Sequence, residues 1–296
     1  MNIEELNIVQ VSQTPLAAAP WEITSCLKKY GNLKVRLIQS VHAFVNGMSF
    51  PKDLIIDLDQ TEVINIIQKA DLVHIHDTCP DELIPYLKGK KVIIQFHSVP
   101  KKHDFAKMNA LTSHRFTVEQ PMQVATYSYP TLPNMIDVEA YSPKQTINDI
   151  PKIVFAPTNG RAMNVPGSKA RNEVQGILNK FAGTFTLDIF DNLSYFENLA
   201  RKRSADILID DVLNCTFNRT ALEGACFGLV VMTSLVGTGF MFTTLANLED
   251  NLIKLRDNMK IMENYKEASR AWVLKHWHPG NQVNQYIDQY KRILNG

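Results

Sequence analysis

The sequence predicts an α/β protein with two Rossmann-like, doubly wound domains and a helical C-terminus. Short runs of apolar and β-branched residues alternate with helical patterns, which is typical of βαβ units and parallel sheets. Several runs are apolar at successive positions, as expected when helices cover both faces of a sheet. The alternation stops once, in a proline-rich segment, and then restarts. The 296 residues suffice for two domains of ordinary size.

The N-terminal half contains six candidate strands. They are Ile8–Val11, Val35–Ile38, Leu54–Ile56, Leu72–Ile75, Val92–Gln95 and Val124–Tyr127. A first helix is predicted from Pro15 to Tyr30, ended by Gly31, and the segment from Glu62 to Lys69 places its apolar residues on one helical face. This half is therefore predicted to form one parallel sheet with helical connections.

The break lies between Tyr127 and Pro151, where the chain has four prolines and no sustained periodicity. We predict a linker there, with an N-terminal domain over residues 1–148 and a second domain over 149–279. Two such domains place the carboxyl ends of two parallel sheets opposite each other across a cleft, where such sheets bind ligands.

The second half repeats the alternation. Its candidate strands are Ile153–Ala156, Thr184–Phe190, Ile207–Ile209 and Leu229–Met232, and its candidate helices are Lys169–Phe181, Tyr195–Arg203 and Arg219–Phe227. From Asn247 onward the pattern is helical. The last stretch, 280–296, carries an apolar stripe and is predicted to pack back on the N-terminal domain.

The composition excludes several classes of function. Lys and Arg total 31 against 30 for Asp and Glu, so the net charge of +1 gives no global field that attracts nucleic acid or an anionic membrane. No apolar stretch approaches the roughly 18 residues that span a bilayer, and the N-terminus lacks the basic region of a signal peptide, so we expect a cytoplasmic protein. The sequence lacks the motifs of metalloproteases, α/β-hydrolases, P-loop proteins and standard dinucleotide-binding proteins, which excludes these classes. The cluster Arg201–Lys202–Arg203 is interpreted as a solvated face, and His74 as a structural histidine.

Residues 205–233 form the most informative segment, in which a strand, a polar loop, a helix that opens near Asn218 and a second strand follow in order. Glu223 lies in an otherwise small and apolar helix turn, near the helix N-terminus, where the dipole favours its ionised form. Such a carboxylate can accept two hydrogen bonds from a vicinal diol such as a ribose. The alternative is a helix-start glutamate on a solvated face.

Residues 153–178 form a second candidate segment, a strand followed by a loop with proline, asparagine and glycine, two cations and a helix. Backbone N–H groups at Gly160 and at the helix start, together with Arg161 and Lys169, can form a clamp for a diphosphate. A departing diphosphate needs such compensation. The alternative is that both cations are solvated loop residues.

The segment 205–233 resembles the donor site of family 4-type retaining glycosyltransferases of the GT-B fold, where strand, loop and helix lead to a Glu-Ala-Met-Ala-like turn, a glycine and a strand. The resemblance implies that Glu223 holds the ribose of a nucleotide sugar and that Asp210 precedes the donor loop. Arg219 and Thr220 are predicted to bind the donor as well. Eight positions before Glu223, where the family often has a second glutamate that contacts the transferred sugar, this chain has Cys215.

The segment 153–178 is similar to the corresponding loop of that family, where an arginine and a lysine neutralise the departing nucleotide without a bound metal. The resemblance implies that Arg161 and Lys169 are these catalytic residues and that Asn159 and Gly160 bind the donor. The residues NVPGS widen the spacing between the two cations relative to the common pattern.

The N-terminal domain carries weaker similarities. VSQTPLAAAPWEITSCLKKYG resembles the opening loop and first helix, with Pro15 and Ala18 on the acceptor side and alanine where glycine is usual. His76 and His97 each follow a strand; His97 matches the catalytic histidine beside the transferred sugar, and His76 is an acceptor-side candidate. Lys101 follows the same edge and is expected to meet an anionic acceptor. LPNMIDVEAYSP resembles the interdomain strand and linker of the family.

The resemblance implies a glycosyltransferase that moves a sugar from a nucleotide diphosphate sugar to an acceptor hydroxyl with retention. No cofactor and no metal are expected, and Asp57-Leu58-Asp59, which has D-x-D spelling, is interpreted as a solvated strand end. The acceptor stays open between a glycan, a lipid-linked molecule, a small molecule and DNA, and so does the oligomeric state. Two alternatives remain: a viral-type transferase acting on hydroxymethylated DNA bases, which the near-neutral charge disfavours, and a non-catalytic sugar-nucleotide binding protein.

Overall fold

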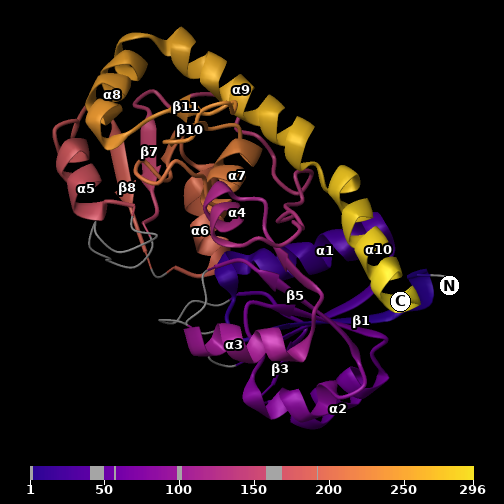
Figure 1. Ribbon diagram of the computed structural model, residues 1–296. Coiled ribbons are helices and arrows are strands. Elements are labelled where there is room, and N and C mark those ends of the chain that lie inside the picture. The colour runs from indigo at the N-terminus through magenta and orange to yellow at the C-terminus, as the bar shows by residue number, and fades with distance from the viewer. Residues whose placement is uncertain (1–2, 41–49, 57, 99–101, 158–168, 192) are drawn as a thin grey trace. The chain divides into compact units, whose positions relative to one another are not determined.

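The computed structural model describes residues 3–40, 50–56, 58–98, 102–157, 169–191 and 193–296 (Figure 1). The chain divides into two compact units. The first comprises Met1–Glu119, Gln123–Asp137 and His278–Gly296, and the second comprises Gln120–Met122 and Val138–Trp277. The division after Asp137 falls inside the proline-rich segment. Each unit contains one parallel sheet with helices, which confirms the predicted α/β class.

The first unit has a six-stranded parallel sheet in the order β3-β2-β1-β4-β5-β6. Its strands are β1 (Asn7–Ser12), β2 (Lys34–Gln39), β3 (Leu54–Ile55), β4 (Leu72–His76), β5 (Lys91–Phe96) and β6 (Arg115–Thr117). This is the strand order of the Rossmann fold, and the order reverses between β1 and β4. In α/β sheets of this kind, ligands bind at the carboxyl ends of the strands beside such a reversal.

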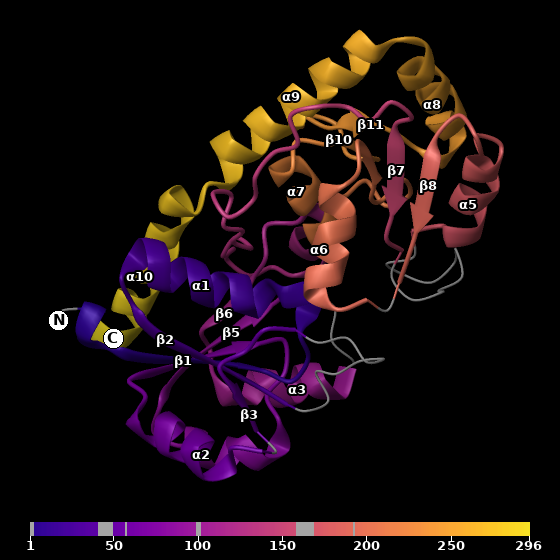
Figure 2. The ribbon, with the colours of Figure 1, turned by 180° about the vertical axis from the view of Figure 1, so that it is seen from behind.

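Helices cover both faces of the first sheet (Figures 1 and 2). One face packs on α2 (Gln60–Lys69), η5 (Asp81–Leu87) and α3 (Lys102–Leu111), and the other on α1 (Ala19–Gly31) and α10 (Pro279–Asn295). A Cβ at Gly31 would lie 2.9 Å from Cγ2 of Val283, so glycine at this position lets α10 approach α1. Two short 3-10 turns, η1 (Ile3–Glu5) and η2 (Leu16–Ala18), flank β1.

The second unit has a five-stranded parallel sheet in the order β11-β10-β9-β7-β8. Its strands are β7 (Lys152–Phe155), β8 (Thr186–Ile189), β9 (Ile207–Ile209), β10 (Val230–Thr233) and β11 (Met241–Phe242). Its helical elements are α5 (Arg171–Asn179), α6 (Tyr195–Arg203), α7 (Arg219–Cys226), η6 (Leu245–Asn247), α8 (Leu248–Asp257) and α9 (Met259–Trp277). This strand order is that of flavodoxin-like sheets, and it reverses between β7 and β9.

Helix α7 lies unusually close to the second sheet. A Cβ at Gly224 would be 3.1 Å from Cδ1 of Leu208 on β9 and 3.3 Å from Cγ2 of Val231 on β10. The small residues of α7 therefore seat the helix directly on the strands. This contact fixes the backbone of Gly224, and with it the neighbouring Glu223, against β9 and β10.

The predicted strand Val124–Tyr127 is wrong. Residues Pro121–Thr126 form helix α4, and the Tyr127 N–H donates to the carbonyl of Gln123, four residues earlier. Pro121 opens the helix, where its missing N–H costs nothing, and the Val124 side chain is 47% exposed instead of buried in a sheet. The sixth strand is β6 instead, whose Phe116 is buried.

Gly176 offers a direct test of the helix assignment. It lies exposed in the interior of α5, and no atom stands within 4 Å of the position of an added Cβ. Gly176→Ala should therefore raise the free energy of unfolding by about 0.5–1 kcal/mol, because alanine loses less backbone entropy on folding. Urea denaturation measures the change. Gly224→Ala is the matched control and should destabilise, and a loss of stability in Gly176→Ala would contradict the assignment.

Candidate functional site

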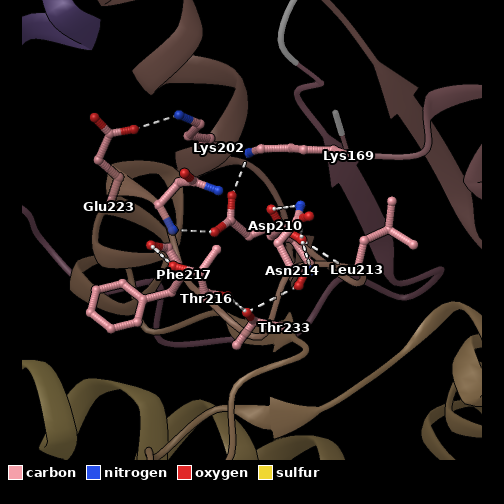
Figure 3. A network of polar contacts seen from close by, with 11 residues as sticks. Lys169, Lys202, Asp210, Leu213, Asn214, Thr216, Phe217, Glu223 and Thr233 are labelled. Carbon is pink, nitrogen blue, oxygen red and sulfur yellow. Dashed lines mark hydrogen bonds and ion pairs between the residues drawn. The ribbon is translucent and has the colours of Figure 1, made fainter. Parts of the chain in front are cut away.

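Lys169 and Asp210 form an ion pair at the reversal of the second sheet. Asp210 directly follows β9, and Lys169 precedes α5, which follows β7. Asp210 also accepts a hydrogen bond from the backbone N–H of Asn218, at 2.6 Å, through its second carboxylate oxygen. Figure 3 shows Lys169 and Asp210 pointing toward each other. Both side chains are buried, so each needs the other's charge.

The loop between β9 and α7 is held by its own polar groups. Asp211 accepts hydrogen bonds from the backbone N–H groups of Leu213 and Asn214, both at 2.9 Å. Thr233, at the end of β10, donates to the carbonyl of Thr216 (Figure 3). Cys215 is exposed in this loop and adopts a left-handed backbone with φ of 48°. The side chain of Cys215, where the resemblance leads one to expect a glutamate, is therefore accessible.

Glu223 lies buried between two cations. Its Oε1 accepts from Nε of Arg219 at 3.0 Å, one helical turn earlier, and its Oε2 forms an ion pair with Lys202 of α6. Burial by itself raises the pKa of Glu223, but Lys202 and Arg219 outweigh it, so the pKa lies below its ordinary value. The interpretation as a glutamate on a solvated face is wrong. Lys202, interpreted as part of a solvated cluster, is 2% exposed.

The network carries an excess of positive charge. Lys169, Lys202 and Arg219 supply three positive charges, and Asp210 and Glu223 supply two negative ones, which leaves one positive charge in excess. Burial lowers the pKa of Lys202, and the nearby Lys169 and Arg219 lower it further, whereas Glu223 opposes the shift. An anion beside these groups would balance the charge.

Four residues predicted from the sequence thus meet in one network: Lys169, Asp210, Arg219 and Glu223. Thr220 lies half-buried on the same first turn of α7. The other donor-side predictions, Asn159, Gly160 and Arg161, fall outside the described residues, and so does Asp57 of the D-x-D sequence. The sequence reasoning missed Lys202, although it lies seven residues after the buried Tyr195 on the same helical face.

A chain of polar rings lies at the carboxyl ends of β4 and β5 in the first unit. Nδ1 of His76 lies 2.9 Å from Nε2 of His97, and Nε2 of His76 lies 3.1 Å from Oε1 of Gln10 on β1. His74 stacks on His76 with ring centroids 4.3 Å apart, and its Nδ1 lies 2.9 Å from the hydroxyl of Tyr290. The structure therefore joins His76 and His97 directly, beside the reversal between β1 and β4.

Burial sets the protonation of this chain. It lowers the pKa of His74 to about 3, helped by His97, and it lowers that of His76 well below its ordinary value. Both rings are therefore neutral near pH 7. Burial also raises the pKa of Asp77 to about 6, against hydrogen bonds from Ser98 and from the backbone N–H of His97, which lies 2.5 Å from Oδ1. Asp77 thus ties the turn after β4 to that after β5.

The loop after β1 has an unusual backbone. Leu16, Ala17 and Ala18 have φ of 45°, 52° and 67°, in the left-handed region that favours glycine, at a cost on the order of 1 kcal/mol per residue. Ala18 is buried just before α1, and Pro15 is buried at the start of the turn. The loop thus adopts a conformation suited to glycine although it contains none. Lys101 lies outside the described residues.

The described part of the chain contains neither a candidate metal site nor a helix that could span a membrane. No group of three or more His, Cys, Asp or Glu side chains there has a geometry that could hold a metal ion. No described helix is both long and apolar enough to cross a membrane.

Comparison with known proteins identifies the fold. The sequence matches no protein-family model and no curated protein sequence. An alpha-glucosyltransferase has a similar structure, with a TM-score of 0.66 at 10% identity over 98% of this chain and 99% of that one. It was solved in complex with UDP-glucose and DNA containing an abasic site, and also with UDP and a 13-mer DNA containing a HMU base.

Two other solved structures are also similar. Sucrose-phosphate synthase from Thermosynechococcus elongatus has a TM-score of 0.58 at 8% identity over 98% and 99% of the two chains. WaaG, a glycosyltransferase involved in lipopolysaccharide biosynthesis, has a TM-score of 0.54 at 13% identity over 95% and 98%. The chain has the GT-B fold that these structures share.

Proposed function

We propose that the protein is a glycosyltransferase that moves a sugar from a nucleotide diphosphate sugar to an acceptor hydroxyl, with retention of anomeric configuration. The observation that carries this proposal is the buried network of three cations and two carboxylates at the strand-order reversal of the second sheet, in a chain with the GT-B fold. A diphosphate supplies the negative charge that this network lacks. The similar alpha-glucosyltransferase and its UDP-glucose complex support the same class.

The roles follow from the charges. A carboxylate offers about four acceptor sites, and the contacts from Lys202 and Arg219 occupy two of those on Glu223, which leaves acceptors for a ribose diol. Lys169 and Arg161 would stabilise the charge that develops on the leaving diphosphate, and this charge is greater in the transition state than in the intact donor. An oxygen of the leaving diphosphate would act as the base toward the acceptor hydroxyl. Catalysis would therefore rest on positioning and on charge stabilisation.

A panel of UDP, GDP, ADP and CDP, with and without their sugars, tests the proposal by thermal shift. A ligand at 100 times its dissociation constant stabilises the protein by roughly 2.7 kcal/mol, which is readily detected. Sugar transfer or donor hydrolysis with the best ligand supports an enzyme. Binding with neither reaction supports a non-catalytic sugar-nucleotide binding protein, and the absence of any shift contradicts both.

A second candidate is transfer to a hydroxymethylated base in DNA. The likeness to an alpha-glucosyltransferase solved with DNA extends over 98% of this chain and favours transfer to DNA. The net charge of +1 disfavours it, because contacts to DNA phosphates normally need a basic surface. The decisive experiment compares duplex DNA with and without hydroxymethylated bases as acceptors. Transfer to the modified duplex, with binding that weakens steeply as salt rises, would support this candidate, and no transfer would exclude it.

Transfer is expected to proceed without a metal ion. The chain offers Arg161 and Lys169 as cations for the leaving diphosphate in place of a metal ion, and Lys169 lies buried beside Asp210. Activity measured after treatment with EDTA should therefore equal that of the untreated protein, with manganese or magnesium adding nothing. Loss of activity in EDTA that either metal restores would overturn this expectation.

A further inference from the structure

Glu223 pairs with two buried cations. Arg219 contacts its Oε1 at 3.0 Å from the same helix and Lys202 contacts its Oε2 from α6, so the described groups of the network carry one more positive charge than negative charges. Buried charges cost several kcal/mol each unless they are well paired, and apolar replacements are often as stable. A buried cation of this cost indicates a role for Lys202 beyond stability, and its contact with Glu223 indicates that the role concerns this carboxylate.

The contacts show what Lys202 does to the carboxylate. Lys202 reaches from α6 to Oε2, while Arg219 reaches along α7 to Oε1, so the two oxygens are held from two different helices. A carboxylate held at both oxygens cannot rotate, and its remaining acceptor sites point in fixed directions. Lys169 and Asp210 are the other charged groups of the same network.

We propose that Lys202 is a positioning residue of the donor site, which holds the Glu223 carboxylate ionised and oriented so that it accepts hydrogen bonds from the ribose diol of the donor. This inference rests on the proposed function. In this role Lys202 affects the ribose through Glu223, whereas a cation of the other kind would contact the diphosphate directly. The two roles differ in which part of the ligand they affect.

A double-mutant cycle with two ligands tests the inference. The cycle comprises wild type, Lys202→Met, Glu223→Gln and the double variant. Each protein is titrated by calorimetry with two ligands: the nucleotide among UDP, GDP, ADP and CDP that gives the largest thermal shift, and the 2′,3′-dideoxy analogue of that nucleotide. Lys202→Met should raise the Kd for the ribonucleotide about 10-fold, the scale of one hydrogen bond to a charged group. It should change the Kd for the dideoxy analogue less than twofold, and should add less than twofold in the Glu223→Gln background.

The pH dependence gives a second readout. In Lys202→Met, burial raises the pKa of Glu223 with Arg219 as its remaining close cation, so Glu223 takes up a proton as the pH falls. The ratio of the Kd of Lys202→Met to that of wild type, in which the titration of the ligand's own phosphate cancels, should therefore rise between pH 8 and pH 5.5. The ratio of the Kd of the double variant to that of Glu223→Gln should stay flat, because no carboxyl remains at this position.

Two variants control for folding. Arg203→Met removes an exposed cation from the same helical turn and should leave both Kd values unchanged. Lys202→Arg keeps the charge and should stay within about threefold of wild type, so it tests the inference if Lys202→Met does not fold.

Three results would overturn the inference. Equal losses for the ribonucleotide and the dideoxy analogue, or additive effects in the cycle, would assign Lys202 to the diphosphate. An unchanged Kd of Lys202→Met for the ribonucleotide would show that Lys202 has only a structural role. Wild type that binds no nucleotide would overturn the proposed function and this inference together, whereas the first two results leave the proposed function standing.

Discussion

Asp210→Ala should lower the free energy of unfolding of the second unit by about 3–5 kcal/mol, the cost of breaking a buried ion pair by removing one partner. The substitution strands the buried ammonium of Lys169 and leaves the Asn218 N–H without its acceptor. Urea denaturation followed by the fluorescence of Trp272 and Trp277, which both lie in this unit, measures the loss in a Trp21→Phe background.

Two comparisons separate this effect from a general loss of charge. Glu249→Ala breaks the exposed Lys180–Glu249 pair and should cost no more than about 1 kcal/mol. Replacing both partners in Lys169→Met/Asp210→Leu should recover much of the stability, because no unpaired buried charge remains. A loss below 1 kcal/mol in Asp210→Ala would show that Lys169 has another way to satisfy its charge.

The fold was largely predictable because strands buried on both faces leave continuous apolar runs. Ile207–Ile209 and Tyr195–Arg203 have the predicted bounds, since each is delimited by polar or small residues. β11 escaped prediction because its two residues, Met241 and Phe242, are too few to show a period. The strand predicted over Val124–Tyr127 was wrong because its β propensity is weaker than the effect of Pro121, which opens helix α4.

The candidate site was only partly predictable. Asp210 is predicted by the resemblance, which places an aspartate before the donor loop, and Glu223 stands out in the sequence because a carboxylate among small apolar residues is unusual. Lys202 does not, because three successive cations give no sign of which one turns inward, and only its seven-residue spacing from Tyr195 places it on the buried face of α6. The pairing of Lys202 with Glu223 depends on how α6 and α7 pack against each other, which the sequence pattern of neither helix specifies.

Acid should destabilise the first unit between pH 7 and pH 5, by on the order of 2–3 kcal/mol. The folded pKa of His74, about 3, lies below its ordinary 6.5, so the folded state binds fewer protons than the unfolded chain and loses stability as the pH falls below 6.5. His76 adds the same effect. Asp77 opposes it, because its folded pKa of about 6 exceeds the ordinary 3.8 and favours the folded state as the pH falls through 6. Two histidines outweigh one aspartate.

The variants resolve the opposing contributions. His74→Gln removes one group that must stay neutral in the folded state, so the acid loss should become shallower by on the order of 1 kcal/mol per pH unit. Asp77→Asn removes the opposing group, so the loss below pH 6 should become steeper by a similar amount. Urea midpoints at pH 5, 6, 7 and 8, followed by the fluorescence of Trp21 on α1 in a background where Trp272 and Trp277 are replaced by Phe, report both changes in the first unit. A wild-type profile that is flat over this range, with unchanged slopes in both variants, would contradict the prediction and show that the folded protein takes up protons at His74 and His76 as readily as the unfolded chain does.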